Sequence, residues 1–176
     1  MKIIFRATAR FVKDVREDLE RSHRFASERV GFISIKAASA PNRLLLIAER
    51  YHPVDDDDYL DDPSVGAMMG QEAIRKALNV ALLQPVGMFH VHMHGHKGPP
   101  GFSRTDLTEQ AHFVPDFFKV RKDMPHGAIV LSNNRATGRV WLNPDRVLDI
   151  SEFNVVGWRY AFFQGLRSHL SRATTQ

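Results

Sequence analysis

The residues best suited to chemistry are four histidines at alternate positions, His90, His92, His94 and His96, within the segment GMFHVHMHGHKGPPGFSRTD of residues 87–106. In a β-strand, alternate side chains point to the same face, so we expect His90 and His92 to project together. Two imidazoles can bind one divalent ion, but a catalytic zinc site commonly takes three protein ligands. The spacing therefore predicts part of a metal site that needs a third ligand.

A carboxylate is a natural third ligand, and Asp106 follows the histidines after a loop rich in glycine and proline. Such a loop can turn the chain back, so that the first turn of the next helix faces the end of the histidine strand. Ser103 and Asp106 also have the Ser-x-x-Asp spacing of a helix capping box, which is the usual meaning of that pattern alone. Capping and metal binding can share one turn, and we predict a zinc site of His90, His92 and Asp106.

The histidine tract has two other interpretations. It could be a solvent-facing segment that binds metal weakly and has no function. Alternatively, His92 and His94 could be the ligands, which would leave a shorter loop before Ser103. If His90 and His92 bind the metal, His94 and His96 would be loop residues at the mouth of the site, open to substrate contact, occasional metal contact or simple solvation.

The composition limits the classes of protein to consider. A chain of 176 residues that is 43% hydrophobic can bury one core, so we expect a single domain over residues 1–176. The net charge of +4 is small and no long basic block concentrates it, so we do not expect a nucleic-acid partner. The absence of cysteine excludes thiolate ligands, disulfides and a cysteine nucleophile. No apolar run approaches the roughly 20 residues that span a bilayer, and we expect a cytoplasmic protein without a membrane contact.

The hydrophobic pattern predicts an α/β (α+β) domain, with a mixed sheet flanked by helices. The acidic segment 52–64 should be an exposed loop, because its aspartates repel one another. The small residues of 37–42 should form the turn of a hairpin. We expect strands at 2–6, 30–36, 43–52, 84–92, 126–132 and 137–143, and helices from about 11 to 22, 65–83, 103–113 and 157–172.

The spacing Gly87-x-x-His90-x-His92, followed by Ser103-x-x-Asp106, resembles the JAMM motif of the JAB/MPN metalloproteases. In that family the histidines end a strand and the Ser-x-x-Asp opens the following helix. The resemblance implies a single MPN-like domain with a mixed, mainly antiparallel sheet flanked by helices. This chain departs from the family pattern because its loop between the second histidine and the serine is longer. Placing Gly87 three residues ahead of the first ligand favours His90 and His92 over the later pair.

The family also has an upstream glutamate just before a strand, and Glu28 in Glu28-Arg-Val-Gly31 fits that place. The resemblance implies that Glu28 is the general base and that the Ser103 hydroxyl donates to the oxyanion. It implies Zn²⁺ as the cofactor. Glu49, at the end of another predicted strand, is a competing candidate for the base.

The substrate implied by the resemblance is a ubiquitin-like protein or its conjugate, cleaved at a peptide or isopeptide bond at the modifier's C-terminus. Proteins of a ubiquitin-like activation system are the implied partners. A catalytically idle scaffold and a hydrolase of small peptides or amidated metabolites are the alternatives. The acidic run between Asp55 and Asp62 could line a groove for a basic tail, although a surface loop without a role is the commoner case.

Overall fold

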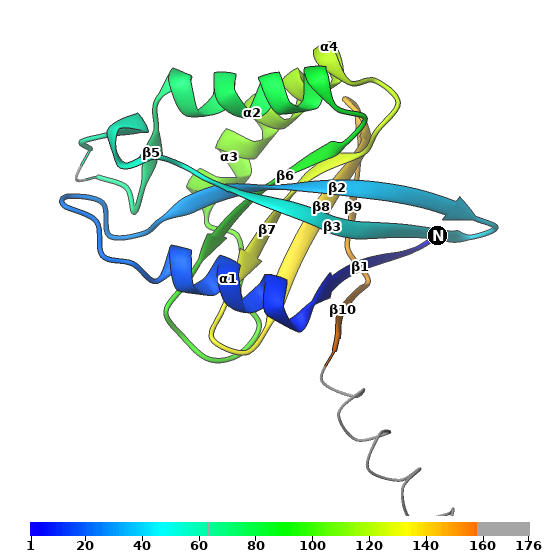
Figure 1. Ribbon diagram of the computed structural model, residues 1–176, viewed down its shortest axis with the longest axis horizontal. Helices are drawn as coiled ribbons and strands as arrows, with labels where there is room; N and C mark the ends of the chain where they lie inside the picture. The colour runs from blue at the N-terminus through cyan, green and yellow to red at the C-terminus, as the bar shows by residue number, and fades with distance from the viewer. Residues whose placement is uncertain (63, 158–176) are drawn as a thin grey trace, which may run out of the picture.

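The computed structural model describes residues 1–62 and 64–157 as one domain built on a curled sheet of eight strands (Figure 1). The strand order is β10-β1-β3-β2-β6-β7-β8-β9, and most neighbouring pairs are antiparallel. The predicted α+β class with a mixed, mainly antiparallel sheet is therefore confirmed. The strands are β1 (Lys2–Thr8), β2 (Val30–Ala40), β3 (Arg43–Pro53), β6 (Gly87–Met93), β7 (His126–Leu131), β8 (Ala136–Asn143), β9 (Arg146–Asp149) and β10 (Glu152–Val156), and β4 (Tyr59–Leu60) pairs separately with β5 (Met68–Met69).

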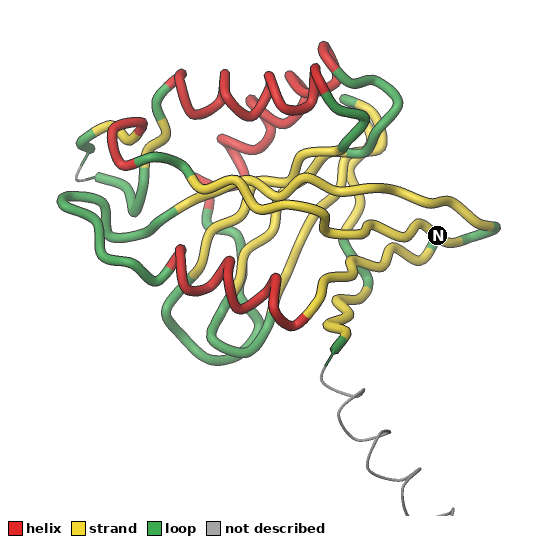
Figure 2. The backbone as a smooth tube through the Cα atoms, in the orientation of Figure 1, coloured by secondary structure: helices red, strands yellow, loops and turns green. Residues whose placement is uncertain are grey.

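Helices cover both faces of the sheet, as Figures 1 and 2 show. Helix α1 (Ala9–Leu19) lies on one face, whereas α2 (Gln71–Leu83), α3 (Arg104–Phe113) and the short α4 (Phe117–Val120) lie on the other. The core is accordingly divided into two clusters of buried hydrophobic residues, one beneath α1 and one beneath α2 to α4. None of the helices in the described ranges is long and apolar enough to cross a membrane.

Strand β6 lies inside the sheet, with β2 on one side and β7 on the other. Its side chains alternate as predicted: Phe89 and Val91 belong to the cluster beneath α1, and Met88 belongs to the opposite cluster. His90 and His92 share the face of Met88, toward α3. The sheet therefore presents both imidazoles to the helix that carries Asp106.

The β2–β3 hairpin is longer than predicted. Residues 37–40, expected in the turn, continue β2, and the reversal needs only Pro41 and Asn42. Asn42 adopts a φ of 58°, in the left-handed region that asparagine tolerates better than most residues. Small residues were misleading here because alanine and serine fit an exposed strand end as readily as a turn.

The helix predicted over 65–83 begins only at Gln71, so its first part is wrong. Residues 64–70 are committed to other hydrogen bonds: the Gly66 carbonyl accepts from the backbone N–H groups of Ser27 and Glu28 at 2.9 and 3.0 Å. The Gly70 N–H donates to the carbonyl of Asp58 at 2.7 Å. These tertiary contacts override the helix propensity of the sequence and bring the segment next to Glu28.

The first helix ends at Leu19 rather than near residue 22. The carbonyls of Arg21 and Ser22 accept from the buried guanidinium of Arg29 at 2.8 and 2.9 Å. The chain must leave the helix to make these contacts. The predicted C-terminal helix, 157–172, falls from residue 158 onward outside the described residues.

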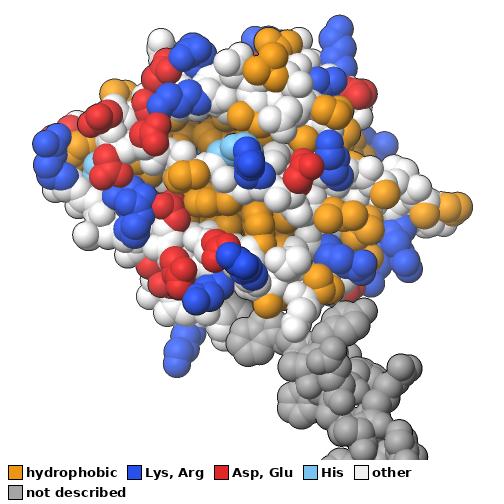
Figure 3. All heavy atoms as spheres, viewed as in Figure 1, with side chains coloured by type: hydrophobic (Ala, Val, Ile, Leu, Met, Phe, Trp, Pro, Cys, Tyr) orange, Lys and Arg blue, Asp and Glu red, His pale blue; other side chains and the backbone are white. Residues whose placement is uncertain are grey.

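The acidic segment is more structured than an exposed loop. Asp56–Asp58 forms a 3₁₀ turn, and Asp58 is only 9% exposed. Lys76 of α2 contacts the carboxylates of Asp55 and Asp58 at 2.6 and 2.7 Å, which compensates the burial of Asp58. On the face in Figure 3, acidic and basic side chains are interspersed.

Strands β9 and β10 were not predicted. They form the two edges of the sheet, β9 beside β8 and β10 beside β1. The residues between them contact both neighbouring strands: the Ile150 N–H donates to the Gly138 carbonyl at 2.8 Å, and the Ser151 N–H donates to the Ile3 carbonyl at 2.9 Å. Strand β10 then pairs in parallel with β1. Ile150 and Ser151, the two residues between β9 and β10, thus connect both edges of the curled sheet.

Candidate metal centre

His90 and His92 are held at the middle of the sheet by strand pairing on both sides. His92 lies opposite Val30 of β2 and Val130 of β7, and His90 takes the next place on the same face. The two residues are only 8% and 2% exposed. Their backbones are therefore fixed by the strand pairing.

Both ring nitrogens of both histidines are buried and have no hydrogen-bond partner among the described residues. An unpaired buried polar atom costs roughly 1–3 kcal/mol, so four in one place call for an explanation. The surroundings of His90 are apolar, with the rings of Phe32 and Phe113 edge-on at 5.7 and 5.4 Å between centroids. Imidazole nitrogens that face a carboxylate suit zinc, so this donor set fits the predicted metal.

Asp106 lies on the first turn of α3, opposite His92. The Ser103 hydroxyl oxygen accepts from the Asp106 N–H at 3.1 Å, and Asp106 Oδ2 accepts from the Ser103 N–H at 2.7 Å, which is the predicted capping box. The same Oδ2 atom is 3.5 Å from His92 Nε2. That separation is at the limit of a hydrogen bond, and His92 Nε2 has no hydrogen-bond partner among the described residues, so the contact is electrostatic. One helical turn therefore caps α3 and faces the histidines.

The electrostatics keep the site in a form that can bind a cation. Burial lowers the pKa of His90 to about 3, with a further lowering from His92 and an opposing effect of the Asp106 carboxylate. For Asp106, burial raises the pKa, but contacts with His92 and the Ser103 N–H and hydroxyl outweigh it and hold the pKa well below its usual range. At neutral pH, His90 therefore keeps a free lone pair and Asp106 is ionised.

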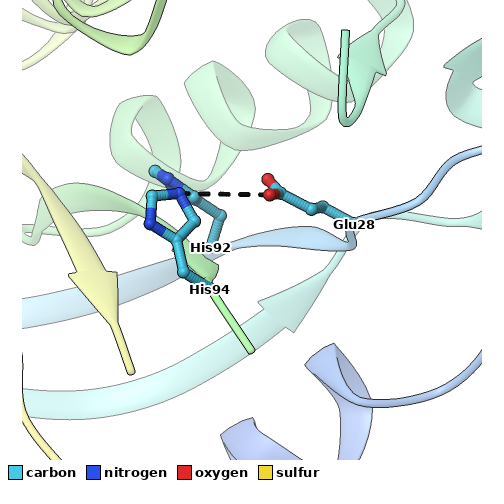
Figure 4. A group of neighbouring side chains, drawn as sticks. All are labelled: Glu28, His92 and His94. Atoms are coloured by element: carbon cyan, nitrogen blue, oxygen red, sulfur yellow. Dashed lines mark ion pairs between the residues drawn. The ribbon is translucent and has the colours of Figure 1, made fainter. Parts of the chain in front are cut away.

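Figure 4 shows Glu28, His92 and His94, which form the group of three possible metal-ligating side chains that the described residues bring together; of the predicted ligands, His92 belongs to this group and His90 and Asp106 do not. Glu28 Oε1, just before β2, is 4.0 Å from His94 Nε2, just after β6. Ligand atoms of Glu28, His92 and His94 all lie within 4.8 Å of one another. His94 thus reaches further into the site than a residue at its mouth, whereas His96 is exposed and its Nδ1 lies 3.1 Å from the Lys97 carbonyl oxygen.

Two contacts hold the segment that carries Glu28. The Gly66 carbonyl accepts from the backbone of Ser27 and Glu28, as described above. The residue after Glu28, Arg29, is 3% exposed. Its guanidinium donates to the backbone carbonyls of Arg21 and Ser22 and to the Asp56 carboxylate, the last at 2.8 Å. The glutamate therefore projects from a short segment with a well-defined backbone.

All five residues predicted for the site line one cavity of about 420 Å³, together with His94. The competing base candidate Glu49 lies elsewhere, on β3, with its carboxylate 3.9 Å from Lys36 Nζ. In the part of the chain that the structure describes, the acidic run contributes no aspartate to this cavity. The remaining lining residues are Val30, Leu60, Ser64, Val65, Gly66, Ala67, Met68, Met69, Ile74, Thr105, Glu109, Gln110 and Phe113.

The sequence predicts neither Gln110 nor Gly66 as a site residue and does not settle the place of His94. Helical spacing could have found Gln110, which lies four residues after Asp106 and three before Phe113 on the face of α3 toward β6. No local pattern indicates Gly66, because its role depends on a contact with a residue 38 positions earlier in the chain.

Comparison of the sequence with models of protein families finds no match, and comparison with curated proteins finds none either.

Proposed function

We propose that the protein is a zinc-dependent peptidase or isopeptidase of the JAMM type. The observation that carries the proposal is the convergence of His90, His92, Asp106, Glu28 and Ser103 on one cavity, where the four imidazole nitrogens have no partner among the described residues. The proposed substrate is a ubiquitin-like protein or conjugate, hydrolysed at the modifier's C-terminus, and this part rests on the motif resemblance. A cytoplasmic location and partners from a ubiquitin-like activation system belong to the same proposal.

We assign His90, His92 and Asp106 as the ligands. In a tetrahedral zinc site with bonds near 2.1 Å, ligand atoms are about 3.4 Å apart. The 3.5 Å between His92 Nε2 and Asp106 Oδ2 is close to that value, whereas the 4.0 Å between His94 and Glu28 is longer. This choice leaves the Glu28 carboxylate available to move a proton.

Zinc, when bound, would lower the pKa of a water molecule and polarise the carbonyl of the scissile bond. Glu28 would accept the proton of the attacking water and deliver it to the leaving amine. The Ser103 oxygen already accepts from the Asp106 N–H, so its own O–H proton is free to donate to the developing oxyanion. Asp106 and Ser103 would be placed for these roles by the capping box.

The decisive experiment measures metal content by plasma mass spectrometry on tag-free protein, for the wild type and Asp106→Ala. We expect about one zinc per chain, lost in the variant. Asp116→Ala is the matched control. Asp116 lies in the 3₁₀ turn directly after α3 and pairs with Lys119 at the surface. Zinc that is absent from the wild type, or indifferent to Asp106, would overturn the assignment and favour a scaffold without catalysis.

Activity is tested separately with ubiquitin-like fusion proteins and a panel of short peptides. Glu28→Gln should keep its zinc and lose at least about 100-fold in kcat/KM, the contribution of a general base. Glu49→Gln serves as the control and should match the wild type. Cleavage of short peptides but not of fusions would identify the small-substrate hydrolase instead.

A further inference from the structure

Gln110 is a buried side chain in the same cavity that the proposed mechanism does not use. It is 1% exposed, and neither its amide oxygen nor its amide nitrogen has a hydrogen-bond partner among the described residues. A neutral amide buried in this way carries a cost that an apolar residue of the same shape would avoid. Together with His90 and His92, Gln110 supplies six of the seven unpaired buried side-chain atoms in the described chain.

The place of Gln110 on α3 shows what it faces. Asp106, Gln110 and Phe113 follow one another at helical spacing on the face toward β6. Asp106 lies opposite His92, at 3.5 Å, and the Phe113 ring lies against His90, at 5.4 Å between centroids. Gln110, between them along the helix, therefore faces the interval between the two imidazoles.

Of the two histidines, His90 has the more apolar surroundings. His92 has the Asp106 carboxylate, whereas His90 is flanked by Phe32 and Phe113. A histidine ligand normally donates its second ring N–H to an oxygen acceptor, which fixes its tautomer and orientation. Gln110, which lines the same cavity and has an unpaired, buried amide oxygen, offers such an acceptor.

We propose that Gln110 is a positioning residue for His90. Its amide oxygen accepts the N–H of one ring nitrogen, a bond that the two unpaired side chains form by reorienting, and the other ring nitrogen then keeps its lone pair toward the metal. This inference rests on the proposed zinc site, because it explains how one of the assigned ligands is held in the correct tautomer.

The first test uses the metal-free protein and requires no activity. Nitrogen-15 NMR of the imidazole of His90 at neutral pH should show one neutral tautomer in the wild type, and a mixture of both in Gln110→Met, which keeps the shape but removes the acceptor. Gln110→Glu keeps an acceptor oxygen and should preserve the single tautomer. A mixture in the wild type, or a spectrum unchanged in Gln110→Met, would overturn the proposal even if zinc binds.

The second test measures zinc affinity by competition with a chelating dye. Gln110→Met should bind zinc about 10- to 100-fold more weakly, as expected for loss of a hydrogen bond to a ligand. Gln110→Glu should stay near the wild type, and so should Thr108→Ala, because Thr108 is exposed on the same helix and does not line the cavity. Equal affinity in Gln110→Met would count against positioning. Failure of the wild type to bind zinc would instead refute the proposed function, while the tautomer measurement would still decide the role of Gln110.

Discussion

Gly66 lies directly against the carboxylate of Glu28. A β-carbon built on Gly66 would be 2.8 Å from Glu28 Cδ and 2.9 Å from Oε2, closer than real contacts allow. The Gly66 carbonyl also accepts from the backbone of the Ser27–Glu28 segment. The glycine therefore sets both the backbone and the side-chain position of the proposed general base.

Gly66→Ala should displace the Glu28 carboxylate, because the end of a glutamate side chain moves more easily than the backbone around it. We expect kcat/KM to fall by about 100-fold, as for a misplaced catalytic group, with zinc content and thermal stability close to the wild type. Gly101→Ala is the control, since a β-carbon there meets no atom of the described chain within 4 Å. Unchanged activity in Gly66→Ala would argue against Glu28 as the base.

The choice between the two histidine registers can be tested with single ligand replacements. His90→Gln and His92→Gln should each abolish stoichiometric zinc, because three protein ligands are needed for a tight site. His94→Gln should keep about one zinc per chain, with at most a small loss of affinity. Zinc lost from His94→Gln but retained in His90→Gln would instead assign Glu28, His92 and His94 as the ligands.

The stability of the fold should fall in acid because of His126. This side chain is fully buried; its Nδ1 accepts from the Met88 N–H at 3.1 Å, and its Nε2 is 2.9 Å from the Arg121 carbonyl oxygen. Burial lowers the pKa of His126 to about 4. Smaller effects come from the Arg121 carbonyl and the Asp123 carboxylate, which raise the pKa, and from the Arg121 charge, which lowers it. In the unfolded chain the pKa of His126 is near 6.5, so between pH 6.5 and pH 4 the unfolded chain binds a proton that the folded chain does not bind.

The contribution of His126 is thus fully present above pH 6.5 and is lost as the pH falls toward 4, by on the order of 3 kcal/mol. Urea unfolding across this range should show the loss. His126→Gln removes the titrating group, so its stability should depend less on pH than that of the wild type. Parallel pH profiles for the two proteins would contradict the prediction.

The contacts of Arg29 should contribute to the stability of the fold. Its buried guanidinium binds two backbone carbonyls and Asp56, so Arg29→Met should lower the free energy of unfolding by about 2 kcal/mol. Arg75→Met, which breaks an exposed pair with Glu72, should cost less than about 1 kcal/mol. Chemical denaturation measures the free energy of unfolding of both variants. An equal decrease in Arg29→Met and Arg75→Met would show that the Arg29 contacts add little to stability.

The sequence was most informative where a local pattern has one geometric meaning. Alternation fixed the face shared by His90 and His92, and the Ser103/Asp106 spacing identified the start of α3. It was least informative where distant contacts decide the conformation, as for residues 65–70, which have helix propensity but are bound to Asp58 and the Ser27–Glu28 segment. Strand β10 escaped prediction for the same reason, because its partner β1 lies at the other end of the chain.

The connection of the two sheet edges through Ile150 and Ser151 also has a consequence for folding. The Ile3 N–H donates to the Ser151 hydroxyl across 148 positions of sequence, and such long-range pairings form slowly. Until β10 arrives, β1 has β3 on one side and an open row of backbone groups on the other. During synthesis this edge is open to pairing with another molecule, and β10 then covers it.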